Sequence, residues 1–120
     1  MKPLFLCYEK CSTCQKAKKF LNQNNIAYDE RDLIKEPPSK AELENWLKDY
    51  DLPLRKLFNT SGKLYRELNL KERLSKLSRT EQIELLASSG YLIKRPFLII
   101  NNQVISGFNE KVYQELFLTT

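Results

Sequence analysis

The 120-residue sequence contains no histidine and no apolar run near the roughly 18 residues that cross a bilayer. Without histidine, a catalytic imidazole is excluded, and a zinc site would depend on thiols and carboxylates alone. The apolar stretch after Met1 is shorter than a signal-peptide core, and no small-residue cleavage site follows it. The expected location is therefore cytoplasmic, with no contact to a membrane.

Glycine is also scarce, with three residues scattered at positions 62, 90 and 107, and no Gly/Ser linker or internal repeat divides the chain. A chain of this length can bury a core without disulfide staples. We expect one domain over residues 1–120. The net charge of +5 comes from lysines that alternate with glutamates along the expected helices, which indicates a solvated surface and no direct nucleic-acid partner.

The first third of the sequence predicts a strand, a helix and a second strand. Residues 4–8 form a short apolar run that ends just before Cys11, as in a buried strand. Residues 12–24 have an apolar face at helical spacing and end at Asn24-Asn25, and residues 26–32 alternate as a strand does. Because a helix connects them, the two strands should be parallel.

The middle of the chain, residues 38–90, reads as an inserted helical subdomain. Ser39 with Glu42 and Ser78 with Glu81 have the capping-box spacing that starts a helix. We expect Pro53 to end the first of these helices and Gly90 to end the second in a left-handed conformation. The buried face of the first helix is expected to contain Leu43, Trp46, Leu47 and Tyr50. That of the second is expected to contain Ile83, Leu85 and Leu86.

The last part of the chain predicts a hairpin followed by a helix. Residues 96–100 and 103–105 are strand-like and are separated by Asn101-Asn102, which fits a tight turn. Gly107 should turn the chain, and Asn109 should cap a helix. Its buried side is expected to contain Val112, Tyr113, Leu116 and Phe117. The order βαβ, helices, ββα indicates an α/β fold of thioredoxin-like type with a four-stranded mixed sheet.

The three cysteines, in the stretch CYEKCSTC, carry the most specific functional signal. Cys11 falls where the first strand meets the first helix, so unpaired N–H groups, the helix dipole and Lys10 should hold its pKa below about 8.5. Cys14 lies one turn inside the helix, where it can form a disulfide with Cys11. Thiol–disulfide chemistry is the favoured interpretation.

Other roles for these thiols remain open from the residues alone. A closed zinc site needs four ligands, which three thiols do not supply, so we expect no metal. The C-x3-C-x2-C spacing also resembles the iron–sulfur motif of radical SAM enzymes, although the rest of the chain does not. Buried, inert thiols are the third reading, and it is the favoured one for Cys7, which lies inside the strand.

A second candidate element is Arg95-Pro96, which leads into the third strand. In a thioredoxin-like fold this loop faces the CxxC, a cis bond is accessible at proline, and Arg95 can hold an anion. A proline that merely starts a strand is the plainer alternative.

Four ordered motifs, CSTCQKAKKFL, EPPSKAEL, FNTSGKLYRELNL and KRPFLI, together resemble the arsenate reductase (ArsC) family, including its Spx regulators. The resemblance implies Cys11 as the nucleophile, Cys14 as the resolving thiol, and Arg95 and Pro96 as the anion-binding arginine and cis-proline. With Ser12 and Thr13, which lie between the cysteines, Arg95 and Pro96 are the expected substrate-binding residues.

The chain departs from the glutathione-coupled arsenate reductases at three positions. It has Cys14 where they have serine, Cys7 where they have histidine, and Asn59 where they have a second arginine. We therefore expect a thiol oxidoreductase acting on a small oxyanion or a disulfide, with no bound cofactor and with glutathione/glutaredoxin or thioredoxin as electron donor.

The alternative implied by the same resemblance is an Spx-like redox sensor that binds RNA polymerase. Pro53 stands where those regulators have their docking glycine, and the sequence ends at Thr120, before the position of their basic tail. Both departures favour the enzyme.

Overall fold

The computed structural model describes residues 2–101 and 103–118. Its sheet has four strands in the order β2-β1-β3-β4, formed by Asp29–Asp32, Leu4–Cys7, Phe97–Ile100 and Gln103–Ser106. β1 and β2 are parallel, whereas β3 is antiparallel to both β1 and β4. The predicted mixed thioredoxin-like sheet is therefore confirmed.

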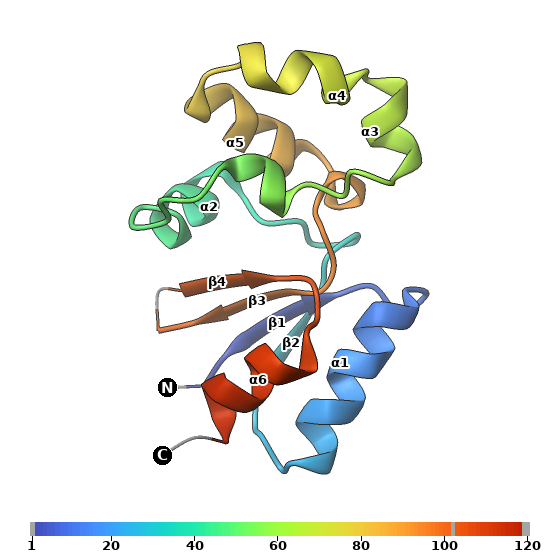
Figure 1. The fold of residues 1–120 in the computed structure, drawn as a ribbon, viewed down its shortest axis with the longest axis vertical. Helices are drawn as coiled ribbons and strands as arrows, with labels where there is room; N and C mark the ends of the chain where they lie inside the picture. Colours follow the sequence, from blue (N-terminus) through green and yellow to red (C-terminus); the bar gives the residue numbers. More distant parts are fainter. Residues whose placement is uncertain (1, 102, 119–120) are drawn as a thin grey trace.

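Two helices cover one face of the sheet: α1 (Ser12–Gln23) and α6 (Glu110–Phe117) (Figure 1). Phe5 and Leu98 point from the sheet into this layer and pack with Phe20 of α1 and Tyr113 of α6. Asn25 has a positive φ of 56°, and the Asn109 side chain caps α6 by accepting a hydrogen bond from the Val112 N–H.

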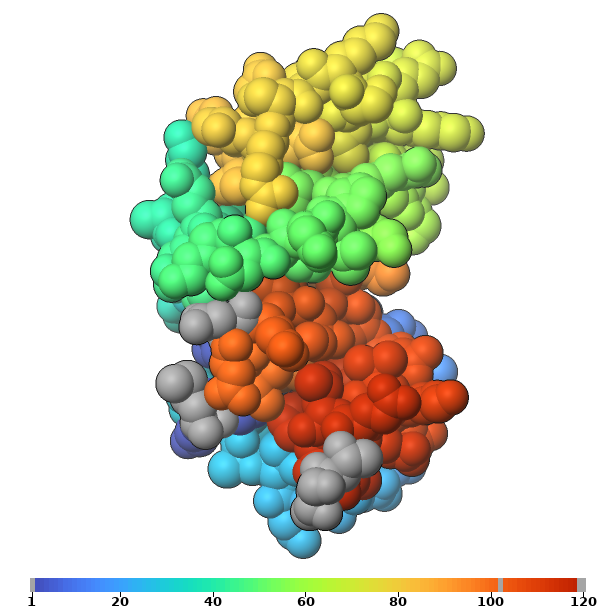
Figure 2. Space-filling view, turned by 60° about the vertical axis from the view of Figure 1, so that its left-hand side comes forward, coloured from blue at the N-terminus to red at the C-terminus, as the bar shows by residue number. Residues whose placement is uncertain are grey.

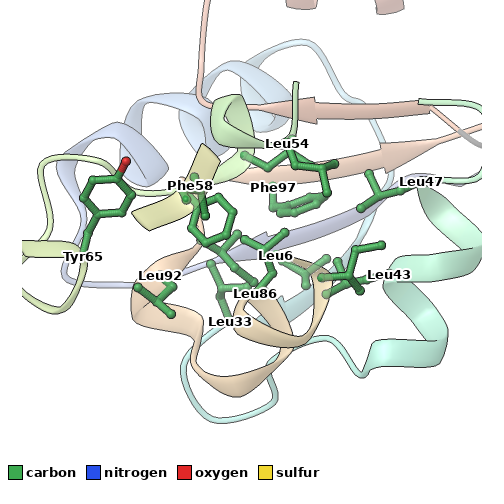
Figure 3. Packing of buried hydrophobic residues seen from close by; sticks show 14 of the residues in the cluster. Leu6, Leu33, Leu43, Leu47, Leu54, Phe58, Tyr65, Leu86, Leu92 and Phe97 are labelled. Atoms are coloured by element: carbon green, nitrogen blue, oxygen red, sulfur yellow. The ribbon is translucent and has the colours of Figure 1, made fainter. Parts of the chain in front are cut away.

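All helices described between residues 40 and 92 form a second layer, here called the helical segment, on the other side of the sheet (Figures 1 and 2). Its α-helices are α2 (Lys40–Trp46), α3 (Lys63–Glu67), α4 (Leu70–Arg73) and α5 (Arg79–Ser88). Three 3₁₀ helices accompany them, namely η1 (Leu54–Leu57), η2 (Leu74–Lys76) and η3 (Gly90–Leu92). Leu6 and Phe97 extend from the sheet into this layer and pack with Leu43, Phe58 and Leu86 (Figure 3). Among the described helices none is both long and apolar enough to span a membrane.

Both predicted capping boxes are present. The Ser39 hydroxyl accepts from the Glu42 N–H while the Glu42 carboxylate accepts from the Ser39 N–H, and Ser78 and Glu81 repeat the arrangement. In each pair two N–H groups at the start of a helix are satisfied, which explains why the sequence predicted these helix starts well.

Two predicted boundaries are wrong. β2 starts at Asp29 instead of residue 26, because pairing with β1 begins at Leu4 opposite Asp29. α2 ends at Trp46, well before Pro53, and the carbonyl groups of Leu47 and Tyr50, which follow the helix, accept hydrogen bonds from the Arg79 guanidinium at 2.7 and 3.3 Å. Pro53 instead precedes η1.

Gly90 is not a left-handed helix cap. Extended backbone at Ser89 ends α5, and Gly90 begins η3. A Cβ atom on Gly90 would lie 2.1 Å from the Leu33 carbonyl oxygen. Glycine is therefore required for the close approach between the helical segment and the chain that follows β2.

The predicted hairpin turn and final helix are confirmed with one correction. Asn101 has a φ of 49° and Gly107 a φ of 74°, whereas Asn102 lies outside the described residues. In α6, Tyr113 is fully buried, but Val112 is 38% exposed, contrary to the prediction. Val112 follows the cap closely and lies on the solvent side of the first turn.

Candidate functional site: a dithiol at the start of α1

Cys11 is the N-cap residue of α1. Its backbone is extended (φ −99°, ψ 120°), its N–H donates to the Tyr8 carbonyl at 2.9 Å, and its carbonyl accepts from the Gln15 N–H at 3.1 Å. As a thiol, Cys11 makes no side-chain capping hydrogen bond, so the N–H groups of the first turn remain available to a thiolate.

The surroundings of Cys11 favour its ionised form. Burial raises the pKa of Cys11, but the N–H and thiol of Cys14, the N–H of Thr13 and the charge of Arg95 outweigh burial. The pKa of Cys11 is therefore below its ordinary value. The cation that acts on the sulfur is Arg95, from a distant segment, whereas the sequence pointed to Lys10.

Cys14 lies in the first turn of α1, next to Cys11, and its surroundings favour the neutral thiol. It is fully buried, and its sulfur accepts a hydrogen bond from the Tyr8 N–H at 3.4 Å. Burial raises the pKa of Cys14 to about 12, and the negative charge of Cys11 adds to the effect. Cys14 is thus a neutral thiol that donates to the Cys11 sulfur, and both thiols are free.

Arg95 lies over the ring of Tyr8, with 5.1 Å between the guanidinium carbon and the ring centroid. The Arg95-Pro96 peptide is cis, and the Pro96 carbonyl accepts from the Gly107 N–H at 2.8 Å. Within residues 2–101 and 103–118, Arg95 has no hydrogen bond or ion pair. Its charge is therefore available to an anion.

A pocket of about 520 Å³ opens beside Cys11. Its lining residues come from the start of α1, the chain before α3, the segment between η3 and β3, and the end of β4 with the turn that leads to α6. Cys11, Thr13 and Arg95 line it, but Ser12 and Pro96 do not. Ser12 is exposed at the start of α1, and Pro96 is buried. Three of the expected site residues are therefore brought together, with Cys14 next to Cys11.

Sequence reasoning did not assign the other lining residues to the site. They come from the chain before α3, the segment after η3, and the end of β4 with the turn after it, and are Asn59, Ser61, Lys94, Ser106, Gly107, Phe108 and Asn109. Lys94 adjoins Arg95 in KRP, and Asn59 and Ser61 belong to the NTSG stretch, so the quoted family motifs contained a signal for these three. None of the pocket's lining residues is a carboxylate, so Lys94 and Arg95 make it positively charged.

Cys7 does not line this pocket. It is 3% exposed and its thiol donates to a Glu30 carboxylate oxygen at 3.6 Å. Burial and the charge of Glu30 raise the pKa of Cys7 to about 12. These surroundings fit a core residue. In the part of the chain that the structure describes, no cluster of three or more Cys, Asp or Glu side chains has the arrangement of a metal site.

Comparison with known proteins adds the following relationships. The ArsC family model matches residues 6–116. The uncharacterized protein YusI of Bacillus subtilis is 49% identical over 92% of this chain and 94% of its own. A crystal structure from Streptococcus mutans, titled as a possible arsenate reductase, superimposes with a TM-score of 0.87 at 43% identity, covering 95% of this chain and 96% of that one. The global transcriptional regulator Spx of the same species is 29% identical over 92% of this chain and 78% of its own.

Proposed function

The chain belongs to the ArsC family, and from that premise we propose that it is a thiol oxidoreductase with Cys11 as nucleophile and Cys14 as resolving thiol. The observation that carries the proposal is the contrast between the two sulfurs. The pKa of Cys11 is lowered at the mouth of a basic pocket, while Cys14 beneath it is a buried neutral thiol that donates to it.

With a disulfide substrate, the Cys11 thiolate attacks one sulfur and forms a mixed disulfide, while the other sulfur leaves as a thiolate and takes a proton from water. Cys14 then loses its proton to solvent and attacks the Cys11 sulfur. The Cys11–Cys14 bond forms, and the bound half of the substrate leaves as a second thiolate. The substrate gains two electrons and the dithiol loses two.

With an oxyanion such as arsenate, Cys11 attacks the central atom and a protonated oxygen leaves as water. Attack of Cys14 on the Cys11 sulfur then leaves the bonding pair on arsenic, which departs as arsenite. In both cases a thiol reductant, either glutathione with glutaredoxin or thioredoxin, must return the disulfide to the dithiol. Arg95 orients the anionic substrate, because its guanidinium has no carboxylate partner in the described part of the chain.

The regulator Spx motivates a second candidate, since it is similar to this chain over 92% of this chain and 78% of its own length. In that case the Cys11–Cys14 bond would change the shape of a surface offered to RNA polymerase, and the protein would turn over no substrate. Both candidates form the Cys11–Cys14 disulfide. They differ in whether this disulfide is part of substrate turnover or changes a surface that binds RNA polymerase.

Steady-state kinetics separate the two candidates. We expect consumption of arsenate or 2-hydroxyethyl disulfide when glutaredoxin with glutathione, or thioredoxin with its reductase, is supplied. Cys11→Ser should abolish turnover, and with no thiol reductant added, Cys14→Ser should stop after one exchange with the substrate bound to Cys11. Absence of turnover by the wild type, together with retention of RNA polymerase by only one redox form, would instead favour the regulator.

A further inference from the structure

A second pocket of about 410 Å³ adjoins the pocket of Cys11. The two pockets share Asn59 and Arg95 as lining residues, so they are contiguous. Leu64 of α3 and Tyr91 of η3 also line the second pocket, and the exposed surface of its lining is mainly apolar. The reaction steps described above do not use this pocket.

Tyr91 of the second pocket is connected through the ring of Tyr8 to Arg95, which lines both pockets. The ring of Tyr91 meets that of Tyr8 edge to face at 6.1 Å, and Tyr8 in turn lies under Arg95. The Asn59 side-chain amide donates to the Tyr91 carbonyl at 3.4 Å, which links η3 to the chain before α3. Tyr91 is 47% exposed, so part of its ring surface is accessible to a ligand.

The charges of the two pockets differ. Lys94 and Arg95 face the Cys11 pocket without a carboxylate among its lining residues. In the second pocket, Lys63 is paired with Glu67 at 3.7 Å, so these two charges offset each other, and the shared Arg95 supplies the remaining charge. A ligand that filled both pockets would therefore carry negative charge near Cys11 and an apolar group near Leu64 and Tyr91.

The sizes of the pockets favour an organic ligand. Pockets for drug-sized molecules measure roughly 300–1,000 Å³, and each of these two falls within that range. An oxyanion with one central atom would occupy only a small part of the space beside Cys11. A disulfide with a substituent on each side of the sulfur uses more of the available surface.

We propose that the preferred substrate is a peptide disulfide whose reacting cysteine bears a carboxylate and is preceded by an apolar residue. The carboxylate contacts Lys94 and Arg95, the sulfur meets Cys11, and the apolar side chain enters the pocket between Leu64 and Tyr91. This inference rests on the function proposed above, because it assigns substrate groups around the same nucleophile.

Three activated peptides test the substrate assignment. Acetyl-Leu-Cys and acetyl-Ser-Cys with free carboxylates, and acetyl-Leu-Cys amide, are each converted to the mixed disulfide with 2-thiopyridine. All three have the same leaving group, and Cys14→Ser limits the reaction to one exchange. Release of pyridine-2-thione then gives the second-order rate constant for Cys11.

The Leu peptide should react about ten times faster than the Ser peptide, as expected for partial burial of a leucine side chain. The carboxylate form should react roughly three to ten times faster than the amide, and added salt should reduce that difference. Equal rates for all three peptides would overturn the inference while leaving the proposed function intact. No reaction with any peptide would overturn both.

Variants of the pocket test its location. Leu64→Gln should lower the Leu/Ser rate ratio toward one, whereas Leu68→Gln should preserve it. Leu68 is a matched control because it is also half-buried beside the core and does not line the pocket. Tyr91→Ser, at an exposed position, provides a second test that does not depend on the packing of α3. An unchanged ratio in both pocket variants would contradict the assignment.

Discussion

At the scale of single residues, depth determines which of two neighbouring thiols ionises. Cys11 and Cys14 are one helical turn apart, but only Cys11 is reached by the N–H groups of the helix start and by Arg95. Cys14 is fully buried and is further disfavoured as an anion by the charge on Cys11. One thiol therefore attacks, and the other is held as a neutral thiol that donates a hydrogen bond to Cys11 until the second step.

Alkylation by iodoacetamide at graded pH reports this difference directly. Cys11 should be modified at lower pH and faster than Cys14, because its pKa is lowered. Arg95→Gln removes a positive charge that favours the thiolate, so it should shift the Cys11 profile to higher pH. Lys10→Gln is the matched control, and it should shift the profile less. Equal, slow labelling of Cys11 and Cys14 would contradict the assignment of the nucleophile.

Cys7 provides a test at the same scale with the opposite expectation. Its thiol is buried against Glu30, away from the pocket, so Cys7→Ala should leave turnover largely intact. The substitution removes a buried sulfur and its contact, and we expect a loss of about 1 kcal/mol in the free energy of unfolding. Kinetics and urea denaturation on the same sample measure both effects. A large loss of turnover with unchanged stability would make Cys7 a participant in the reaction.

At the scale of elements, Arg31 of β2 ties the sheet to α2. Its guanidinium donates to both Glu42 carboxylate oxygens, at 2.8 and 2.9 Å, and to the carbonyl oxygens of Glu36 and Pro37. The hydrogen bonds and charge of Arg31 lower the pKa of Glu42 to about 2. One carboxylate thus takes part in a capping box and in a contact between elements.

The lowered pKa of Glu42 predicts a pH dependence of stability. Because the folded-state pKa lies below the ordinary value of about 4.3, the stabilisation is complete above pH 4.3 and is lost as the pH falls toward 2. Glu42→Gln should therefore flatten the dependence of unfolding free energy on pH over that range. Glu44→Gln, an exposed position in the same helix, should leave the slope unchanged. The same slope in Glu42→Gln and wild type would contradict this account.

Predictability from the sequence depended on how local the stabilising contacts are. The starts of α2 and α5 were predicted because each capping box involves residues only three positions apart. The end of α2 was not, because Arg79, from far along the chain, binds the carbonyl groups of Leu47 and Tyr50 that follow the helix. Gly90 was misassigned for the same reason: its neighbour is the Leu33 carbonyl, which no local pattern reveals.

At the scale of the whole molecule, contact between the helical segment and the sheet limits substitution at Gly90. Gly90→Ala would place a methyl group against the Leu33 backbone, so we expect a loss of about 1–3 kcal/mol in unfolding free energy. At Gly62, an added methyl group meets mainly the Asn59 side chain, which can move. Gly62→Ala should therefore cost less. Equal stability of Gly90→Ala and wild type in denaturant titration would show that the two layers can separate without cost.

The candidate site likewise divides into a local and a long-range part. The placement of Cys11 and Cys14 at the start of α1 followed from the change between strand and helix periodicity. The basic wall beside Cys11 required Lys94 and Arg95, and the lining also includes Asn59 and Ser61 from the helical segment. These residues meet only when the layers assemble, so a single sequence indicated them through family motifs and not through periodicity.

The most direct test of the central claim is the mass and peptide map of the reduced wild-type protein after one equivalent of oxidised glutathione. We predict loss of two hydrogen atoms, a bridge between Cys11 and Cys14, and no retained glutathione. A stable glutathione adduct on either thiol, or a protein that remains fully reduced, would contradict the claim that these two thiols act as one redox pair.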